Sequence, residues 1–457
     1  MARLGAVTAR RAEASPRAMP ELVSQLRQCG QRAGLAAVGV APASPMQATR
    51  RVLEDRKAAG LAAGMQFTYR NPSRSTDPSR IVPGARALVV GAWWYGGAVQ
   101  EVAEGVPDGR PRGLVARYAR TDHYADLRAA LGSLARALGE QGWSARVVAD
   151  DNALVDRAAA QLGGLGWFGK NCNILLPGRG SWFLLGSVVT DAPLPPDVPI
   201  AEGCGRCQRC LRSCPTGALV APGVLDARKC LAWLLQAEGV FPWELRAALG
   251  VRVYGCDDCQ ESCPPNREAV ELLGQRGRGE STAAGDRDRA GTGAVVVASG
   301  TDEGGIRLPV GGRPGQRHVD ILGMLEASDA ELLRSHGRWY IPRRDPRYLR
   351  RNALIVLGNT ADGWSPPVGA ALERYLHSED EMLQAHAVWA AARLGRRDLV
   401  ARTPGLLGGG KGLVAQELSR LDEVVPRAPA ATLGAAHADG ATAVLASEVP
   451  AQVAAGQ

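Results

Sequence analysis

The sequence predicts three structured parts: an α+β or α/β domain, a short cysteine-rich module inserted after it, and a C-terminal α-helical domain. Three observations lead to this fold class. Short apolar runs alternate with amphipathic helical patterns over residues 18–200, eight cysteines fall within residues 204–263, and helical periodicity resumes near residue 319 after a Gly-rich stretch. At 457 residues the chain is long enough for several domains with separate cores.

The first domain, residues 18–200, is expected to be a sheet covered by helices. Apolar residues at helical spacing predict helices over residues 22–33, 52–63 and 124–138. Apolar runs bounded by Gly or Pro predict short buried strands at residues 36–40, 87–91, 145–148 and 182–185. No G-x-G-x-x-G fingerprint opens a helix after a strand, which argues against a dinucleotide-binding fold.

The cysteine-rich module, residues 201–268, carries the most specific pattern in the chain. In bacterial ferredoxins with C-x2-C-x2-C-x3-C-P spacing, three close thiolates hold one 4Fe-4S cluster and the fourth reaches another. This spacing is found at Cys204, Cys207, Cys210, Cys214 and Pro215. A second set follows at Cys256, Cys259, Cys263 and Pro264, and Cys230 completes eight thiols. The pattern therefore predicts a ferredoxin-like module with two 4Fe-4S clusters.

Cross-ligation divides the eight cysteines into two groups. The cluster 1 group is Cys204, Cys207, Cys210 and Cys263. The cluster 2 group is Cys214, Cys230, Cys256 and Cys259. Two alternatives are zinc knuckles, because CxxC pairs also suit tetrahedral zinc, and disulfides, which require an oxidising compartment. The two other cysteines, Cys29 and Cys172, are expected to be small buried apolar residues.

The remainder of the chain divides by composition. Residues 269–317 are rich in Gly, Arg, Asp and Thr and are expected to form a flexible linker. Residues 318–400 show Ala-rich helix pairs and predict a HEAT-like helical repeat domain, whereas residues 401–457 are expected to be a poorly ordered tail. No stretch approaches the roughly 18 apolar residues of a membrane span, and the Arg10-Arg11 pair precedes no apolar export segment. We therefore expect a cytoplasmic protein.

Several motifs in order resemble those of epoxyqueuosine reductases. They are ARYAR at residues 116–120, DHY at 122–124, Asp150 followed six residues later by Asp156-Arg157, GLGWFGKN at 164–171, GCG at 203–205, CPTGA at 214–218 and YGCDDCQ at 254–260. The resemblance covers residues 20–268 and resumes at 318–395, where that family carries a helical repeat domain. It implies removal of the epoxide oxygen from a modified base at the tRNA wobble position, giving queuosine and water.

The resemblance also implies cofactors and site residues. Two clusters would feed electrons to a base-off cobalamin, in its cob(I) or cob(II) state, and a carboxylic acid would protonate the departing oxygen. The matched proton donor is Asp150, with the adjacent Asp151 and a mere helix-capping role as the alternatives. The matched cobalamin contacts are Arg70, Asp150, Lys170, Ile174, Cys256 and Asp257. Surface charge is the alternative role for Arg70 and Lys170.

A group of basic residues suggests how tRNA would bind. The net charge is +8, and five arginines gather at Arg343, Arg344, Arg347, Arg350 and Arg351. Such a group can neutralise phosphates of a tRNA with a GUN anticodon, while a solvated helix face is the alternative. Trp339 and Tyr340 could stack on bases or belong to the core. The resemblance also implies a low-potential donor such as flavodoxin or ferredoxin, and we expect a monomer.

Two other functions remain open at this point. A corrinoid-dependent reductive dehalogenase would also use clusters, but it usually carries a twin-arginine signal and a Tyr donor. A ferredoxin-type electron-transfer protein would need the cysteine-rich module alone, and would leave Asp150 and the GLGW run without a role.

Overall fold

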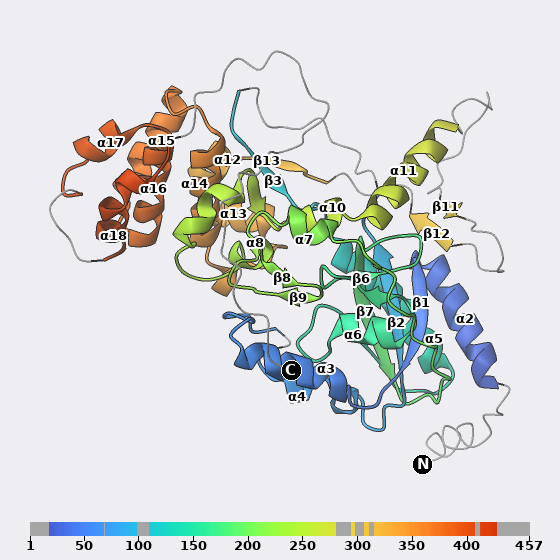
Figure 1. The fold of residues 1–457 in the computed structure, drawn as a ribbon. Helices are drawn as coiled ribbons and strands as arrows, with labels where there is room; N and C mark the ends of the chain where they lie inside the picture. Colours follow the sequence, from blue (N-terminus) through green and yellow to red (C-terminus); the bar gives the residue numbers. More distant parts are fainter. Residues whose placement is uncertain are drawn as a thin grey trace.

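The structure is a computed structural model that describes residues 18–67, 69–97, 109–279, 294–297, 306–309, 315–406 and 412–426. The cysteine-rich module, in green, lies between the first domain, in blue and teal, and the helical domain, in orange and red (Figure 1). Within these residues, no helix combines the length and apolar character needed to cross a bilayer.

A four-stranded antiparallel sheet forms the centre of the first domain. Its strands, in spatial order, are β1 (Ala37–Pro42), β2 (Ala87–Trp94), β7 (Phe183–Thr190) and β4 (Ala145–Val148). All four strands predicted from apolar runs are present. The inner strands β2 and β7 are almost entirely buried, as expected for a sheet with helices on both faces. Since every pairing is antiparallel, the domain is α+β rather than a parallel α/β fold.

Helices cover both faces of this sheet. The helices α2 (Ala18–Arg32) and α5 (His123–Glu140) lie on one face, and α6 (Asp156–Leu162) lies on the other. The helices α3 (Gln47–Ala58) and α4 (Pro72–Ser75) pack on each other, and the short turn η1 (Pro78–Arg80) contacts α4. Gly91 and Gly186 are cross-strand neighbours, and a Cβ on either would lie 2.9 or 2.7 Å from Leu131 of α5. On the opposite face, a Cβ on Gly39 would meet the Gly163 carbonyl at the end of α6. Glycine at these positions lets both helices pack closely.

The cysteine-rich module is built from short elements. They are α7 (Arg209–Ser213), β8 (Leu219–Ala221), β9 (Val224–Leu225), α8 (Leu231–Leu234), η3 (Trp243–Leu245), α9 (Arg246–Leu249), α10 (Asp258–Glu261) and α11 (Pro264–Gly279). Its buried apolar residues, including Leu234, Phe241 and Leu249, share one hydrophobic core with the helical domain. The first domain has a separate core. The sequence placed the module on the first domain and did not predict this shared core.

A second sheet joins three distant parts of the chain. The central strand β3 (Arg112–Val115) pairs in parallel with β10 (Arg252–Tyr254) and antiparallel with β13 (His318–Asp320). These strands come from the first domain, the cysteine-rich module and the start of the helical domain. A short hairpin of β5 (Trp167–Phe168) and β6 (Ile174–Leu175) projects from the first domain. The turn η2 (Arg117–Ala119) follows β3.

The C-terminal part is helical. Its elements are α12 (Ile321–Glu326), α13 (Asp329–His336), η5 (Pro342–Arg344), α14 (Arg347–Thr360), α15 (Pro366–Leu376), α16 (Glu381–Arg393), α17 (Arg397–Arg402), α18 (Leu413–Ser419) and η6 (Leu421–Glu423). The assignment to HEAT-like repeats stays a prediction. Because α18 packs on α16, the folded part continues beyond the predicted limit at residue 400. Residues 427–457 of the predicted tail lie outside the described residues.

The predicted linker, residues 269–317, is described only in part. The helix α11 runs into it as far as Gly279, and β11 (Ala294–Val297) pairs antiparallel with β12 (Ile306–Pro309). Most of the other positions of this linker lie outside the described residues, so its predicted flexibility is not tested.

Candidate active site

The cluster 1 group comes together at the surface of the module. Its four cysteines line one hollow, together with Lys170, Asn171, Leu175 and Pro264. Three of them come from α7 and the turn before it, and Cys263 directly precedes α11. Burial raises the pKa of the Cys263 thiol to about 11, and Cys210, Cys204 and Cys207 reinforce the shift, so all four thiols are neighbours. Cys207 is exposed, while Cys204 and Cys210 are half-buried.

The cluster 2 group gathers deeper in the module. Burial raises the pKa of the Cys259 thiol, and the nearby Cys256, Cys230 and Cys214 raise it further. This mutual influence places the four predicted ligands around one point. The Cys214 sulfur also accepts a hydrogen bond from the Ala218 backbone N–H at 3.2 Å, a contact that would help to hold a thiolate in place.

The donor sets of both groups fit iron-sulfur clusters. Each group supplies four thiols, the ligand set of a cubane cluster. All ten cysteines are free, so the disulfide alternative has no counterpart in the structure. Among the described residues, no three His, Cys, Asp or Glu side chains form a group that could hold a single metal ion.

Asp150 lies on the loop between β4 and α6. Its φ of 55° is in the left-handed region, which Asp tolerates better than most residues. Asp150 is exposed to solvent, but desolvation by the surrounding protein still raises its pKa; Arg128 opposes this shift and Asp151 reinforces it. A raised pKa keeps more of the carboxyl in its acid form near neutral pH. This state suits a proton donor.

The two alternatives for Asp150 find no support in the local geometry. The N-cap of α6 is Val155, which makes no side-chain capping bond, so neither Asp150 nor Asp151 caps the helix. Asp151 instead accepts a hydrogen bond from the backbone N–H of Ala153 at 2.9 Å, which stabilises the loop. Of the two carboxyl groups, Asp151 is held by this hydrogen bond, whereas no described hydrogen bond within the loop holds the Asp150 carboxyl.

A buried carboxyl, Asp156, supports the Asp150 loop and was not predicted as a site residue. Burial raises the pKa of Asp156, the nearby Asp150 raises it further, and a hydrogen bond from the Asp150 backbone opposes the shift. Within the described residues, its Oδ1 atom is buried without a hydrogen-bond partner. In the sequence, the Asp156-Arg157 pair is the signal by which Asp150, rather than Asp151, matches the proton donor of the family.

Tyrosines connect Asp150 with the cluster 2 group. Burial raises the pKa of Tyr124 on α5, and the nearby Asp150 and Asp156 add to the shift. Asp150 also raises the pKa of Tyr254, after the larger effect of burial, and Tyr254 lies two residues before the ligand Cys256. Burial raises the pKa of Cys230 as well, with Arg157 among the groups that oppose it. Asp150 and the cluster 2 group thus border the same region.

The predicted cobalamin contacts are placed differently from one another. Asp257 follows the ligand Cys256, accepts a hydrogen bond from the Arg117 backbone at 2.7 Å, and has a pKa raised to about 6, mainly by burial. Arg70 is exposed. Lys170 donates to the Gly205 carbonyl at 2.5 Å and lines the cluster 1 hollow, while Ile174 is buried in the β5–β6 hairpin. No described side-chain contact brings this set together.

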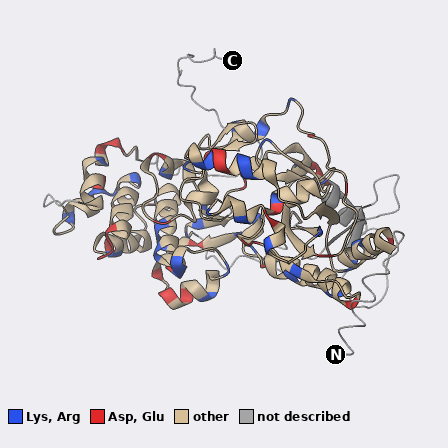
Figure 2. Cartoon of the chain, turned by 90° about the horizontal axis from the view of Figure 1, so that it is seen from below, with Lys and Arg blue, Asp and Glu red and all other residues tan. Residues whose placement is uncertain are grey.

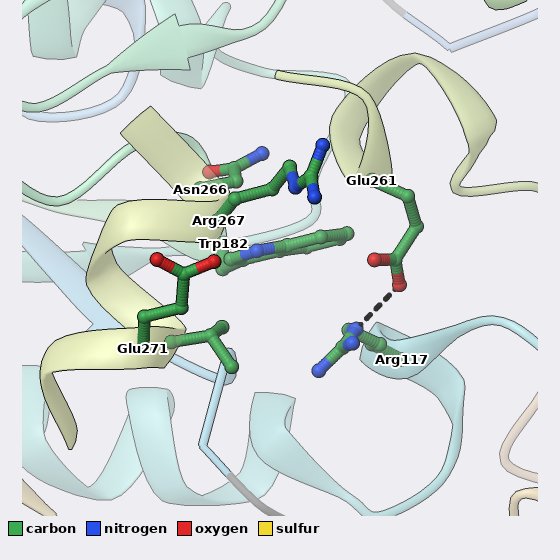
Figure 3. A pocket seen from close by; sticks show the side chains of 7 residues that line it. Arg117, Trp182, Glu261, Asn266, Arg267 and Glu271 are labelled. Carbon is green, nitrogen blue, oxygen red and sulfur yellow. Dashed lines mark hydrogen bonds and ion pairs between the residues drawn. The ribbon is translucent and has the colours of Figure 1, made fainter. Parts of the chain in front are cut away.

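A second hollow lies between η2 and the helices α10 and α11 (Figure 3). The Arg117 guanidinium lies 4.9 Å from the centre of the Trp182 ring and pairs with Glu261 at 2.8 Å. Asn266 closes one side, because its Oδ1 accepts from the Ser181 N–H and its Nδ2 donates to the Gln260 carbonyl. Sequence reasoning missed this hollow, although Arg117 belongs to the ARYAR motif and Asn266 follows the Cys-Pro signal.

The five predicted tRNA-binding arginines differ in accessibility. Arg351 is completely buried and donates to the carbonyls of Leu234, Ala237 and Gly239, so the prediction is wrong for this residue. Arg350 is largely buried and pairs with Asp329. Arg347 is half-exposed and pairs with Asp345 and Asp380. Arg343 and Arg344 are exposed, and Arg343 pairs with Glu238.

The two aromatic residues before these arginines also differ. Trp339 is buried and stacks on Tyr254, with ring centres 4.4 Å apart, so it belongs to the core. Tyr340 is exposed and tilts against Phe67. Among the described residues, Lys and Arg are interspersed with Asp and Glu (Figure 2).

Comparisons with known proteins are consistent with this site. A family model described as a 4Fe-4S double cluster binding domain matches residues 203–266. An epoxyqueuosine reductase from Xanthomonas campestris is 35% identical over 346 residues, which cover 74% of this chain and 86% of that protein. One from Vibrio cholerae is 31% identical, covering 81% of this chain and 91% of that protein.

Solved structures show the same fold. A crystal structure of epoxyqueuosine reductase with an epoxyqueuosine-modified tRNA-Tyr stem loop superposes with a TM-score of 0.72 at 24% identity, covering 89% of this chain and 99% of that one. The Bacillus subtilis enzyme, in a form with a catalytic Asp loop swung out of the active site, superposes with a TM-score of 0.71. Taken with the identities and coverage of the curated relatives, this chain belongs to the epoxyqueuosine reductase family.

Proposed function

We propose that this protein reduces epoxyqueuosine to queuosine at the wobble position of tRNA. The observation that carries the proposal is the order of three groups in space: a surface cluster 1 group, a deeper cluster 2 group, and Asp150 across a shared region of tyrosines. This order suits a reductase that takes electrons at its surface and uses them beside a proton donor. The family relatives carry the name of this activity.

The chain's own residues would hold the clusters and supply the proton. Eight cysteines would bind two 4Fe-4S clusters, each through four thiolates. Their raised pKa values mean that iron must displace protons from Cys263, Cys256 and Cys230 as the clusters assemble. Opening the epoxide leaves negative charge on the departing oxygen, and Asp150 in its acid form would donate a proton to it.

We further propose that cobalamin binds between Asp150 and the cluster 2 group. Asp257 supports this position, because it adjoins the ligand Cys256 and its carboxyl is held by the Arg117 backbone. When bound, cobalamin would supply the reduced cobalt centre that allows the carbon–oxygen bond of the epoxide to be cleaved. Lys170 lies beside the cluster 1 group and Ile174 is buried in the core of the first domain, so we propose that the cofactor contacts Asp150, Asp257 and the exposed Arg70.

For tRNA, we propose contacts from the exposed Arg343 and Arg344 and the half-exposed Arg347. Arg350 and Arg351 are removed from this surface, because the Arg350 side chain is largely buried and Arg351 is completely buried. A low-potential donor such as flavodoxin or ferredoxin would supply the electrons. The expected cytoplasmic location and monomeric state remain predictions.

The decisive experiment is anaerobic reconstitution with iron, sulfide and cobalamin, followed by reaction with epoxyqueuosine-containing tRNA. Iron analysis should give about eight irons per chain, and a bound corrinoid should appear in the absorption spectrum after gel filtration. Mass spectrometry of the digested nucleosides should show queuosine replacing epoxyqueuosine. Full cluster loading without bound corrinoid and without queuosine formation would instead indicate that the protein is a ferredoxin-type electron carrier.

A further inference from the structure

The two cluster sites differ in their access to solvent. In the cluster 1 group, Cys207 is exposed and the four thiols line a surface hollow. In the cluster 2 group, every cysteine is at least half-buried, and the group borders the region of Asp150. An electron carrier too large to enter the protein can therefore approach cluster 1 most closely. Electrons from outside would enter there and continue to cluster 2.

Three exposed arginines are interleaved with the cluster 1 cysteines along the chain, and we call them the arginine rim: Arg206, Arg209 and Arg212. Arg206 lies between the ligands Cys204 and Cys207. Arg209 and Arg212 are three residues apart on α7, a spacing that puts them on one side of the helix. Over the described part of the chain, none of the three is found in an ion pair or side-chain hydrogen bond. Their charges therefore face solvent.

The acidic residues nearest to the rim in the module are already engaged. Glu202 accepts a hydrogen bond from the Cys204 backbone N–H at 3.1 Å. On the adjacent helix α10, Asp258 pairs with Arg252 at 2.6 Å and Glu261 pairs with Arg117 at 2.8 Å. Glu202 keeps its charge, so among these residues three exposed arginines face one carboxylate without a cationic partner, and positive charge is in excess.

We propose that the arginine rim is the docking surface for an acidic one-electron carrier protein, which places its redox group against cluster 1. The proposal rests on the cluster assignment and deepens the proposed function. In each encounter one electron leaves the reduced carrier and enters the oxidised cluster 1, and no atom or proton is transferred. Charge complementarity would steer the encounter and orient the carrier, which raises the association rate more than the lifetime of the complex.

A tRNA phosphate backbone could also bind three arginines, but the position of the rim favours the carrier. The rim arginines alternate with the predicted cluster 1 ligands along the chain, and RNA bound there would cover the proposed entry point. The exposed Arg343 and Arg344, which we propose for tRNA, belong instead to η5 beside the helical domain. The two surfaces can therefore be tested separately.

The test measures cluster reduction without tRNA. The triple variant Arg206→Glu, Arg209→Glu, Arg212→Glu is compared with a control carrying the same charge change at exposed arginines of the first domain: Arg86→Glu, Arg136→Glu, Arg146→Glu. Stopped-flow absorbance follows cluster reduction by a reduced acidic flavodoxin at ionic strengths of about 10 and 150 mM, which change the Debye length from about 30 to 8 Å. We expect the rim variant to lose about ten- to a hundred-fold in the low-salt rate constant and most of its salt dependence, whereas the control keeps both.

Two further measurements keep the proposal falsifiable. Iron content and reduction by photoreduced 5-deazariboflavin, a small uncharged reductant, should be the same in both variants. If Glu at these positions lowers iron content, the Arg→Gln and Arg→Lys triple variants replace it, with Lys expected to restore flavodoxin-dependent reduction. Equal rates for rim and control variants would overturn the proposal, and so would weakened tRNA binding with unchanged reduction. Since no tRNA is present in the kinetic assay, failure here is distinct from failure of the proposed substrate.

Discussion

Replacement of Glu417 by Ala should destabilise the junction between the cysteine-rich module and the helical domain. Glu417 on α18 forms a bidentate ion pair with Arg246 on α9, with N–O distances of 2.6 and 2.9 Å. The Arg246 and Glu417 side chains are only 1% and 7% exposed. The variant leaves the Arg246 charge buried, with the Phe241 carbonyl, two nearby Trp rings and the more weakly interacting Glu244 as its partners among the described residues. Loss of one partner of a buried pair costs about 3–5 kcal/mol.

The assay is urea unfolding of the cluster-loaded protein, followed by far-UV circular dichroism. An exposed pair supplies the matched control: Asp422, which pairs with Arg397 and is 99% exposed, should cost less than about 1 kcal/mol when replaced by Ala. The double variant Arg246→Met, Glu417→Leu should recover most of the loss, because it removes both charges together. A loss below about 1 kcal/mol for Glu417→Ala would refute the reasoning that this pair holds the two parts together.

Three more predictions concern the site. Cys230→Ala should reduce the iron content from about eight to about four per chain, because the described module holds no spare cysteine for cluster 2; full iron content would show that Cys230 is not a ligand. Asp150→Asn should keep both clusters but lose most turnover, because an amide cannot donate the acid proton. Turnover of the wild-type protein should fall as pH rises through the raised pKa of Asp150, since the acid form of the carboxyl is then lost. A fully active Asp150→Asn variant would show that another group is the acid. Charge reversal at Arg343 and Arg344 should weaken tRNA binding. The slope of log K against log salt should fall by about 0.7–0.9 for each lost phosphate contact. An unchanged slope in a filter-binding assay would exclude this surface as a tRNA-binding site.

Local patterns in the sequence were enough to predict the strands and the closely spaced cysteines. The strands β2 and β7 are buried apolar runs, and their composition alone identifies them. Ligands three residues apart, such as Cys204, Cys207 and Cys210, lie near one another whatever the rest of the chain does, but the addition of Cys263 and Cys230 to the two groups rested on the ferredoxin rule of cross-ligation. The pairing directions could not be predicted in this way, since an apolar run is the same in a parallel and an antiparallel sheet.

Contacts between distant segments were beyond sequence reasoning. Nothing in residues 112–115 indicates that β3 pairs with both β10 and β13, because pairing partners depend on how the domains meet. The arginine group failed for a related reason. A run of arginines suggests a charged surface. Arg351 instead points inward and donates hydrogen bonds to the backbone carbonyls of Leu234, Ala237 and Gly239. Burial of an arginine depends on acceptors that only the fold supplies.

The close spacing of the two cluster sites follows from the chain itself. Cys210 and Cys214 belong to different groups but are four residues apart, and so are Cys259 and Cys263. Four residues are about one helical turn, or roughly 6 Å along a helix, so two short links hold the clusters together.

A hydrogen bond joins these two links directly. Ser213 and Ser262, which precede Cys214 and Cys263, lie with their hydroxyl oxygens 2.7 Å apart. Transfer from cluster 1 to cluster 2 therefore crosses a distance set by local backbone geometry, and the packing of the larger domains has little influence on it. In the proposed path, the steps that depend on the surrounding structure are the first and the last: electron entry at the arginine rim and use of the electron beside Asp150.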